Sequence, residues 1–363
     1  MELNNENYKE YIKKYGLKQF CKVLSSNPNI TTLNLYNNNI GEKGAEYIAE
    51  TLKSCKLENS SLHLTTLYLG INNIGEKGAK YIAESLKSCK LKILNLCHNN
   101  IGDKGIEYIA ESLKFNKFLT HLYLNYNNIG EKGAEYIAEA LKSCKLENSS
   151  SHLTTLYLRD NNINDKGAEY IAESLKSCKL KDLNLSYNNI GDKGAEYIAE
   201  ALKFNKFLTQ LYLYNNNIGD KGAEYIAESL KFNKFLTTLY LSDNNINDKG
   251  AEYIGEALKV NKFLINLYLY NNNIGEKGAE YIAEALKSCK LKNSSLHLTT
   301  LYLYNNNISD KGIEYIDDLL KTNRINVEKL KKERIKEKIY LTAVMHGLPW
   351  QFEFLEVFDE FIY

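Results

Sequence analysis

Apolar residues recur along the chain in a two-part pattern that repeats many times. In one copy, residues 267–271 read LYLYN and alternate apolar with polar side chains, which predicts a short β-strand. Residues 277–287 follow as KGAEYIAEALK, in which Ala279, Ile282 and Leu286 recur at helical spacing. That spacing predicts an amphipathic α-helix. The chain therefore alternates short strands with helices.

The first Leu of the strand motif L-x-L-x-x-N marks ten copies of this pattern. These residues are Leu33, Leu67, Leu94, Leu122, Leu156, Leu183, Leu211, Leu239, Leu267 and Leu301. Successive copies begin 27, 28 or 34 residues apart. The longest steps contain the insertions ENSSLH, ENSSSH and KNSSLH, which all precede a strand and therefore project from one rim. The insertions are either tolerated surface loops or part of a binding edge.

The order of the elements also predicts how the copies stack. Because a helix separates every two strands, the strands can pair only in parallel. Paired strands lie about 4.8 Å apart, whereas packed helices need about 8–10 Å. Stacking such units bends the array, with parallel strands on the concave face and helices on the convex face. The pattern thus predicts an α/β repeat solenoid shaped like a horseshoe.

An Asn follows each strand, and a Tyr recurs on each helix. The Asn residues are Asn38, Asn72, Asn99, Asn127, Asn161, Asn188, Asn216, Asn244, Asn272 and Asn306. Backbone groups at this bend lack sheet partners, so we expect the amide side chains to bind them. The helix tyrosines are Tyr47, Tyr81, Tyr108, Tyr136, Tyr170, Tyr197, Tyr225, Tyr253, Tyr281 and Tyr315. We expect these to pack between neighbouring repeats.

The consensus L-x-x-L-x-L-x-x-N-x-I-x-x-x-G-A-x-x-I-A-x-x-L-K, found between residues 16 and 324, resembles the ribonuclease-inhibitor-type leucine-rich repeat. Repeats of this type also occur in NOD-like receptors and Ran GTPase-activating proteins. The resemblance implies a right-handed βα horseshoe. It also implies a binding role, because the family consists largely of scaffolds that bind through the concave face.

The repeats are flanked by different segments. Residues 1–32 form a predicted N-terminal cap, in which GLKQFCKVL matches the helical half of a repeat. The ten repeats occupy residues 33–324. Residues 325–363 form a predicted C-terminal unit, with a separate helix that follows the end of the repeat pattern at Lys321 and stops at Gly347. The aromatic tail LPWQFEFLEVFDEFIY then either covers the last repeat or docks another protein.

Tyrosine dominates the predicted concave face. Seven copies have a Tyr between the two Leu residues, whereas Asn34, Asn95 and Asn184 take this place in the other three. Tyr offers a large contact area and a polar tip, which suits protein interfaces, although it also favours strands. Tyr36, Tyr126, Tyr187, His98 and His121 stand on the same face. The predicted partner-binding residues are Tyr68, Tyr123, Tyr157, Tyr212, Tyr214, Tyr240, Tyr268, Tyr270, Tyr302, Tyr304, Arg159, Asp160, Asp182 and Asp243.

Composition and motifs argue against several other functions. Lys and Arg number 46 against 45 Asp and Glu, so the positive surplus used in nucleic-acid binding is missing. The sequence has no apolar run of membrane-spanning length, and its start does not resemble a signal peptide. The six His lack metal-ligand spacing, and hydrolase and metalloprotease motifs are absent. We therefore expect a cytoplasmic monomer without catalytic residues, metal or cofactor; delivery into a host cell is compatible with this composition.

Three functional hypotheses follow. The leading one is a non-catalytic scaffold that binds a protein partner on the concave, Tyr- and Asn-rich face. The resemblance to Ran GTPase-activating proteins implies an alternative, a regulator of a small GTPase, although the acidic tail typical of those proteins is missing. A third hypothesis is an adaptor whose aromatic C-terminal tail recruits other proteins.

Overall fold

A computed structural model describes residues 8–54, 62–143, 153–288 and 298–345, and it contains a strand in each of the ten copies. The strands are β1 (Thr32–Asn34), β2 (Thr66–Tyr68), β3 (Ile93–Asn95), β4 (His121–Tyr123), β5 (Thr155–Tyr157), β6 (Asp182–Asn184), β7 (Gln210–Tyr212), β8 (Thr238–Tyr240), β9 (Asn266–Tyr268) and β10 (Thr300–Tyr302). They form one sheet in chain order, and every neighbouring pair is parallel. The register pairs the first Leu of one copy with that of the next, as at Leu211 and Leu239.

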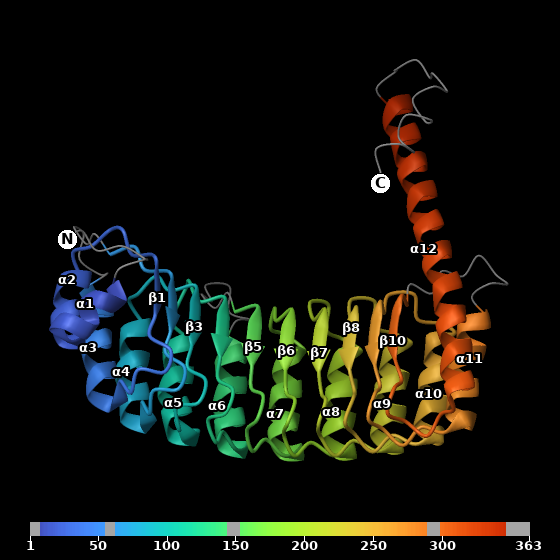
Figure 1. The fold of residues 1–363 in the computed structure, drawn as a ribbon, viewed down its shortest axis with the longest axis horizontal. Coiled ribbons are helices and arrows are strands. Elements are labelled where there is room, and N and C mark those ends of the chain that lie inside the picture. Colours follow the sequence, from blue (N-terminus) through green and yellow to red (C-terminus); the bar gives the residue numbers. More distant parts are fainter. Residues whose placement is uncertain (1–7, 55–61, 144–152, 289–297, 346–363) are drawn as a thin grey trace.

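Helices alternate with the strands and lie on the other side of the array. They are α1 (Tyr8–Tyr15), α2 (Leu17–Leu24), α3 (Gly41–Lys53), α4 (Gly75–Leu86), α5 (Gly102–Leu113), α6 (Glu131–Lys142), α7 (Asp165–Leu175), α8 (Asp192–Leu202), α9 (Asp220–Leu230), α10 (Asp248–Leu258), α11 (Glu276–Ser288) and α12 (Asp310–Met345). Figure 1 shows an arc with the strands along its inner side and the helices along its outer side. The predicted α/β repeat solenoid is confirmed.

One continuous core runs between the strand layer and the helix layer. In the seventh copy Leu211 and Leu213 of the strand segment meet Ala223 and Ile226 of α9, and all four are 0% exposed. Small residues allow neighbouring helices to lie close together. A Cβ atom added at Gly222 would lie 2.7 Å from the Oδ1 atom of Asp192 and 3.1 Å from the Cβ atom of Ala195, both in α8, so the close approach of α8 and α9 favours glycine here.

The recurring Asn side chains connect each repeat to the one before it. The Nδ2 group of Asn161 donates hydrogen bonds to the carbonyl oxygens of Leu124 and Leu158, at 3.1 and 2.9 Å. Its Oδ1 atom accepts from the backbone N–H groups of Asn127 and Ile129, both at 3.0 Å. Equivalent bonds recur at Asn72, Asn99, Asn127, Asn188, Asn216, Asn244, Asn272 and Asn306. The predicted structural role of the Asn row is confirmed.

Aspartate residues cap the helices of the following repeats. The Oδ1 atom of Asp192, at the start of α8, accepts from the backbone N–H groups of Gly219 and Gly222 at 2.7 and 2.8 Å. These groups lie at the start of α9, where they have no partner within the helix. The same contact recurs from Asp103, Asp165, Asp220 and Asp248. The turns with GDKG and NDKG sequences thus link successive helices.

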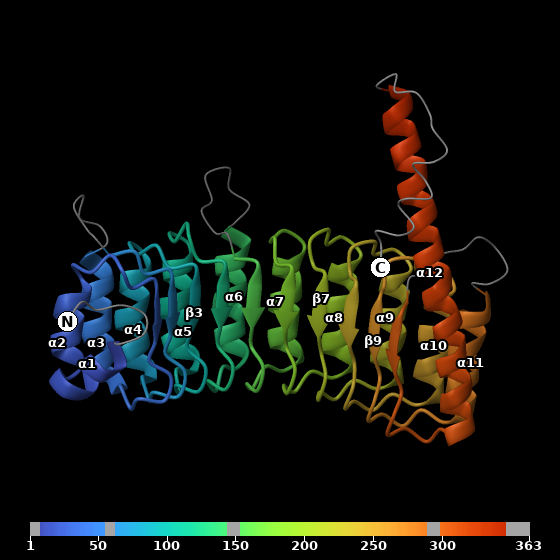
Figure 2. The same ribbon diagram turned by 45° about the horizontal axis from the view of Figure 1, so that its top comes forward.

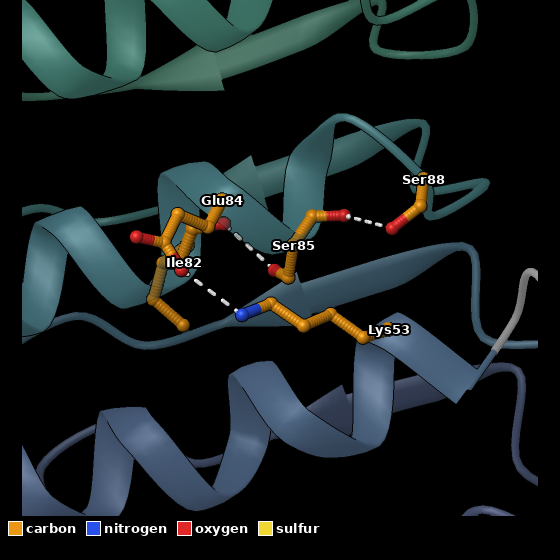
Figure 3. Close-up of polar contacts among 5 residues, drawn as sticks. All are labelled: Lys53, Ile82, Glu84, Ser85 and Ser88. Atoms are coloured by element: carbon orange, nitrogen blue, oxygen red, sulfur yellow. Dashed lines mark hydrogen bonds and ion pairs between the residues drawn. The ribbon is translucent and has the colours of Figure 1, made fainter.

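Polar side chains on the helix layer form ion pairs and hydrogen bonds with nearby groups. Figure 3 shows Lys53 of α3, whose Nζ atom lies 3.0 Å from an Oε2 atom of Glu84 in α4. Beside this pair the fully buried hydroxyl of Ser85 donates to the carbonyl of Ile82, one turn earlier. Eight helix tyrosines, from Tyr47 to Tyr253, are partly buried against the core, which confirms their predicted packing role. The prediction is wrong for Tyr315 of α12, which is 45% exposed because no further repeat covers it.

The N-terminal end contains an unexpected helix. Within the predicted N-terminal cap the repeat pattern indicates a helix only from Gly16 onward, but the polar segment before it also forms a helix, α1 (Tyr8–Tyr15). The Tyr8 side chain is 3% exposed, and its hydroxyl donates to the backbone carbonyl of Asn34 at 2.8 Å. Its ring also lies 5.9 Å from that of Phe20 in α2. The polar segment therefore joins α2 in covering the open end of the core.

The C-terminal helix also differs from the prediction. Sequence analysis expected the last repeat helix to stop near Lys321, with a separate helix after it, but α12 runs without a break to Met345. The residues between, TNRIN (322–326), contain neither Gly nor Pro, and Asn323 is buried at this point. Figure 2 shows α12 extending well past the array. The predicted stop at Gly347 and the aromatic tail lie outside the described residues.

Candidate functional site

The strands place a row of aromatic side chains on the inner face of the arc. Each strand buries its central Leu and turns the two flanking residues to the opposite face. Successive rings in this row lie within 4.0–6.1 Å of each other, centroid to centroid. The pairs are Tyr123–Tyr157 at 5.1 Å, Tyr157–Tyr212 at 6.1 Å, Tyr212–Tyr240 at 4.3 Å, Tyr240–Tyr268 at 4.0 Å and Tyr268–Tyr302 at 5.3 Å.

The Tyr row is continuous although one of its copies has no tyrosine. Asn184 of β6 stands between Tyr157 of β5 and Tyr212 of β7, yet those two rings are in contact above it. Asn184 is only 6% exposed, and its Oδ1 atom accepts from the backbone N–H of Ser186 at 2.9 Å. The ring row therefore extends from β4 to β10. Tyr68 stands apart from it: Asn95 of β3 lies between Tyr68 and Tyr123, and here no ring contact bridges the gap among the described residues.

A second cluster surrounds Arg159, just beyond the end of β5. Its guanidinium carbon lies 4.4 Å from the ring centroid of Tyr187, 5.3 Å from that of Tyr214 and 5.9 Å from that of Tyr126. Tyr187 and Tyr214 also meet edge to face at 5.3 Å. Cation–π contacts of this kind hold a guanidinium in place. The Nε atom of Arg159 is nevertheless buried without a hydrogen-bond partner among the described residues.

Asp182 forms a third feature, beside the tyrosine row. Its Oδ2 atom accepts a hydrogen bond from the Tyr157 hydroxyl at 3.0 Å, whereas its Oδ1 atom is buried and lacks a partner in the described part of the chain. Burial raises the pKa of the Asp182 carboxyl, although the Tyr157 hydrogen bond and nearby His121 lower it. Burial, together with the Asp182 charge, also raises the pKa of Tyr157. The Tyr157 hydroxyl thus stays protonated and donates to the carboxylate at neutral pH.

Changing Asp182 to Asn should stabilise the protein at neutral pH. A carboxyl whose pKa is raised by folding binds its proton more tightly in the folded state, so its ionised form destabilises the fold above that pKa. We expect Asp182→Asn to raise the melting temperature at pH 7. The difference should shrink as the pH falls toward about 4, the pKa of Asp in an unfolded chain. Thermal unfolding across this range measures the effect.

Asp243→Asn provides a matched control for this substitution. The Oδ1 atom of Asp243 already has a partner, because it accepts from the Asn271 side chain at 2.7 Å. The control should leave the melting temperature unchanged or lower it. A melting temperature for Asp182→Asn at or below that of the wild type at pH 7 would show that the Asp182 carboxylate does not destabilise the fold.

The remaining predicted residues lie around these clusters. Tyr270 and Tyr304 stack at 4.7 Å, and Tyr302 and Tyr304 are 46% and 49% exposed near the C-terminal end of the sheet. Asp160 lies beside Tyr126, where burial raises the pKa of the Tyr126 hydroxyl, Arg159 lowers it and Asp160 raises it.

The structure brings Tyr126 and Tyr187 into the site, although the predicted partner-binding set leaves them out. Both occupy the second position after the Leu pair, with φ values of 57° and 53°. The positive φ aims these rings across the face toward Arg159. Sequence analysis placed both residues on this face, but it could not show that side chains from three different repeats converge on one guanidinium.

Other kinds of site find no support in the described residues. No group of three or more His, Cys, Asp or Glu side chains there is placed to hold a metal ion. Among the described helices, none combines the length and apolar character needed to cross a membrane.

Known proteins resemble the chain in its repeats. The family described as Leucine Rich repeat matches residues 26–49, 60–83, 87–110, 115–138, 149–172, 176–199, 204–227, 232–255 and 294–316, more than half of the chain. The protein belongs to the leucine-rich repeat family. No curated protein is significantly similar to it in sequence. One similar solved structure is titled "Leiomodin-1 Actin-Binding Site 2 (ABS2)", with 25% identity, coverage of 48% of this chain and 96% of that one, and a TM-score of 0.41.

Proposed function

We propose that this protein is a non-catalytic scaffold of the ribonuclease-inhibitor-type repeat class, and that it binds a partner protein on the strand face. The observation that carries the proposal is the continuous row of tyrosine rings from β4 to β10. Tyrosines supply contact area and hydroxyl groups together, and they are enriched among the residues that dominate binding energy. A row of this length suits a protein surface better than a small molecule.

The packing of the row also favours tight binding. Tyr212, Tyr240 and Tyr268 stack with interplanar angles of 10°, so their rings are already held by their neighbours. Side chains that are ordered before binding lose less conformational entropy when the partner arrives. The part of the face from β7 to β9, toward the C-terminal end of the sheet, is therefore where we expect the main anchors.

Polar groups around the row supply specificity. The Nε atom of Arg159 and the Oδ1 atom of Asp182 are buried without hydrogen-bond partners among the described residues. Leaving such groups unsatisfied costs free energy. Both atoms are covered in the free protein, so a partner recovers that cost only if binding turns the two side chains toward it and it offers an acceptor to Arg159 and a donor to Asp182. This combination fits a polypeptide, which presents both kinds of group along its backbone and side chains.

Removing three stacked rings tests the proposal. The triple variant Tyr212→Ala, Tyr240→Ala and Tyr268→Ala should weaken binding to a partner captured from the native cell by more than about 1 kcal/mol, because aromatic anchors carry such energies. Titration calorimetry with the purified partner measures the change. The control variant Tyr15→Ala and Tyr315→Ala removes exposed rings away from the strand face. Equal affinities of the wild type and the folded triple variant would rule out the strand face as the binding surface.

A further inference from the structure

A second exposed surface lies on the rim where the helices end and the strands begin. After α8, α9 and α10 the chain reads KFNKF, KFNKF and KVNKF (residues 203–207, 231–235 and 259–263). The Asn side chain of each of the last two turns donates to the backbone carbonyl of the Asn one repeat earlier, at 3.3 Å, so the three turns are direct neighbours. Their apolar side chains form one exposed strip, here called the Phe/Lys rim. The exposed fractions are Phe204 63%, Phe207 42%, Phe232 62%, Phe235 41%, Val260 54% and Phe263 39%.

The fold does not require these phenylalanines. In the turn after α8 the Nδ2 group of Asn205 donates to the carbonyl of Leu175, and its Oδ1 atom accepts from the backbone N–H of Leu208. In other copies Ser-Cys-Lys makes the corresponding turn without any Phe, with Cys89 and Cys178 buried in place of the Asn. The Asn or Cys side chain therefore holds the turn, and the exposed rings beside it are free to serve another purpose.

Continuity distinguishes the Phe/Lys rim from other exposed apolar residues. The turn after α5 has the same sequence, KFNKF (residues 114–118), and its Phe115 and Phe118 are 55% and 43% exposed. The copies on either side of it have Ser-Cys-Lys at this place and no Phe, so that pair stands alone. Scattered apolar residues are ordinary on a protein surface, whereas contiguous apolar strips mark interaction sites. The rim of α8–α10 is such a strip.

The Phe/Lys rim also has a surplus of positive charge. The carboxylates at the ends of α8, α9 and α10 are already paired with the Lys three residues later; the pairs are Glu200–Lys203, Glu228–Lys231 and Glu256–Lys259. The next lysines, Lys206, Lys234 and Lys262, are exposed and form no ion pair with the described residues. The three turns themselves contain no Asp or Glu. The chemical complement of this surface is therefore a segment that combines apolar side chains with carboxylates.

The shape of this side of the molecule favours a single segment over a flat surface. Asn323 of α12 donates to the carbonyl of Leu298, just as Asn261 donates to that of Leu230, so α12 crosses the level of the rim. The helix then continues for 22 residues to Met345, or about 33 Å at 1.5 Å per residue. Figures 1 and 2 show it standing well beyond the array on this side. A flat lipid surface would meet α12 before it met the rim, whereas one helix of a partner fits beside it.

The spacing of the three turns matches the repeat of an α-helix. Packed helices lie about 8–10 Å apart, so the turns that follow α8, α9 and α10 have about that spacing. Residues seven apart on an α-helix are separated by about 10.5 Å along its axis. A helix of about 14 residues thus spans the strip, with apolar residues on the rings and carboxylates beside the lysines. We propose that the Phe/Lys rim binds an acidic amphipathic helix of a partner protein, on a surface separate from the strand face.

Two synthetic peptides of that length test the proposal. Both carry Leu at the same helical positions, and all other positions are Glu in one and Lys in the other. In fluorescence anisotropy the Glu peptide should bind the full-length protein at least about tenfold more tightly than the Lys peptide. Phe232→Ser with Phe235→Ser should weaken binding of the Glu peptide about tenfold or more. Lys206→Glu with Lys234→Glu should do the same and should strengthen binding of the Lys peptide.

Matched controls make the same changes at other turns of the same rim. Phe115→Ser with Phe118→Ser removes the isolated pair, and Lys90→Glu with Lys179→Glu reverses charge in copies without Phe; both should leave binding of the Glu peptide unchanged. Unfolding curves check that all variants fold. The strand-face triple variant should bind the Glu peptide like the wild type, which separates this site from the tyrosine row.

Three results would overturn the proposal. The first is equal affinity of the wild type for the two peptides, and the second is an equal loss of binding in the test and control variants. The third is a different occupant of the rim. Binding to phosphatidylserine vesicles that the Phe232→Ser and Phe235→Ser variant loses would assign the rim to a lipid surface. A dimer mass in light scattering that the same variant loses would assign it to a second copy of the chain.

Discussion

Replacing Asn161 with Ala should destabilise the array by about 3–5 kcal/mol, because several buried backbone groups would lose their hydrogen-bond partner at once. The Asn161 side chain is 7% exposed and bonds to two backbone N–H groups and three carbonyls in two adjacent repeats. Most of these hydrogen bonds are buried, so the backbone groups would have no ready replacement for the Asn161 side chain. Urea unfolding followed by circular dichroism measures the loss.

The neighbouring residue provides the control for this substitution. Asn162 is exposed, and its backbone N–H, which donates to the carbonyl of Ile129 at 2.8 Å, survives mutation to Ala. We expect Asn162→Ala to change stability by less than about 0.5 kcal/mol. In a repeat array each unit contacts mainly its neighbours. The Asn161→Ala substitution should therefore also uncouple the repeats before it from those after it, so that unfolding occurs in two transitions instead of one. Similar stabilities for the two variants would refute the bridging role of the Asn row.

The repeated features were predictable from sequence because each of them occurs in all ten copies of the repeat. A single LYLYN segment is ambiguous, but ten copies in one register predicted the strands, their parallel order and the alignment of Leu with Leu that the sheet shows. The Asn row was predictable for the same reason, because a residue that occurs in every copy is expected to stabilise the packing of one repeat on the next. Periodicity thus determined the fold, including which side of the array each residue type occupies.

The features that occur once were harder to predict. The ring contacts of Arg159 come from Tyr126, Tyr187 and Tyr214, which occupy two different positions in three different repeats. Their meeting depends on lateral distances across the sheet and on positive φ angles, neither of which a pattern reveals. The unbroken α12 could not be predicted from the repeat motif, because the motif ends near Lys321 whereas the helix continues to Met345. The repeat motif ends where side chains stop packing against a neighbouring repeat. A helix, in contrast, ends at residues such as Gly or Pro that interrupt its backbone hydrogen bonds.

Replacing Phe20 with Ala should unfold the N-terminal end of the array selectively. Phe20 is 0% exposed and packs against the rings of Tyr8 and Tyr11, at 5.9 and 6.4 Å. Truncating a buried Phe costs about 3–5 kcal/mol. The end unit has a neighbour on one side only, so fewer contacts offset the loss than in the middle of the array. We therefore expect α1, α2 and β1 to open well below the global transition.

Hydrogen exchange measured by mass spectrometry resolves this local effect. Amides of α1, α2 and β1 should lose protection in Phe20→Ala, while those of α8–α10 keep it. Gln19→Ala, which removes an exposed side chain from the same helix, should leave protection unchanged. Uniform loss of protection along the whole chain would instead mean that the ten repeats unfold as one cooperative unit. In that case the N-terminal helices would stabilise the distant tyrosine row as well as the end of the core they cover.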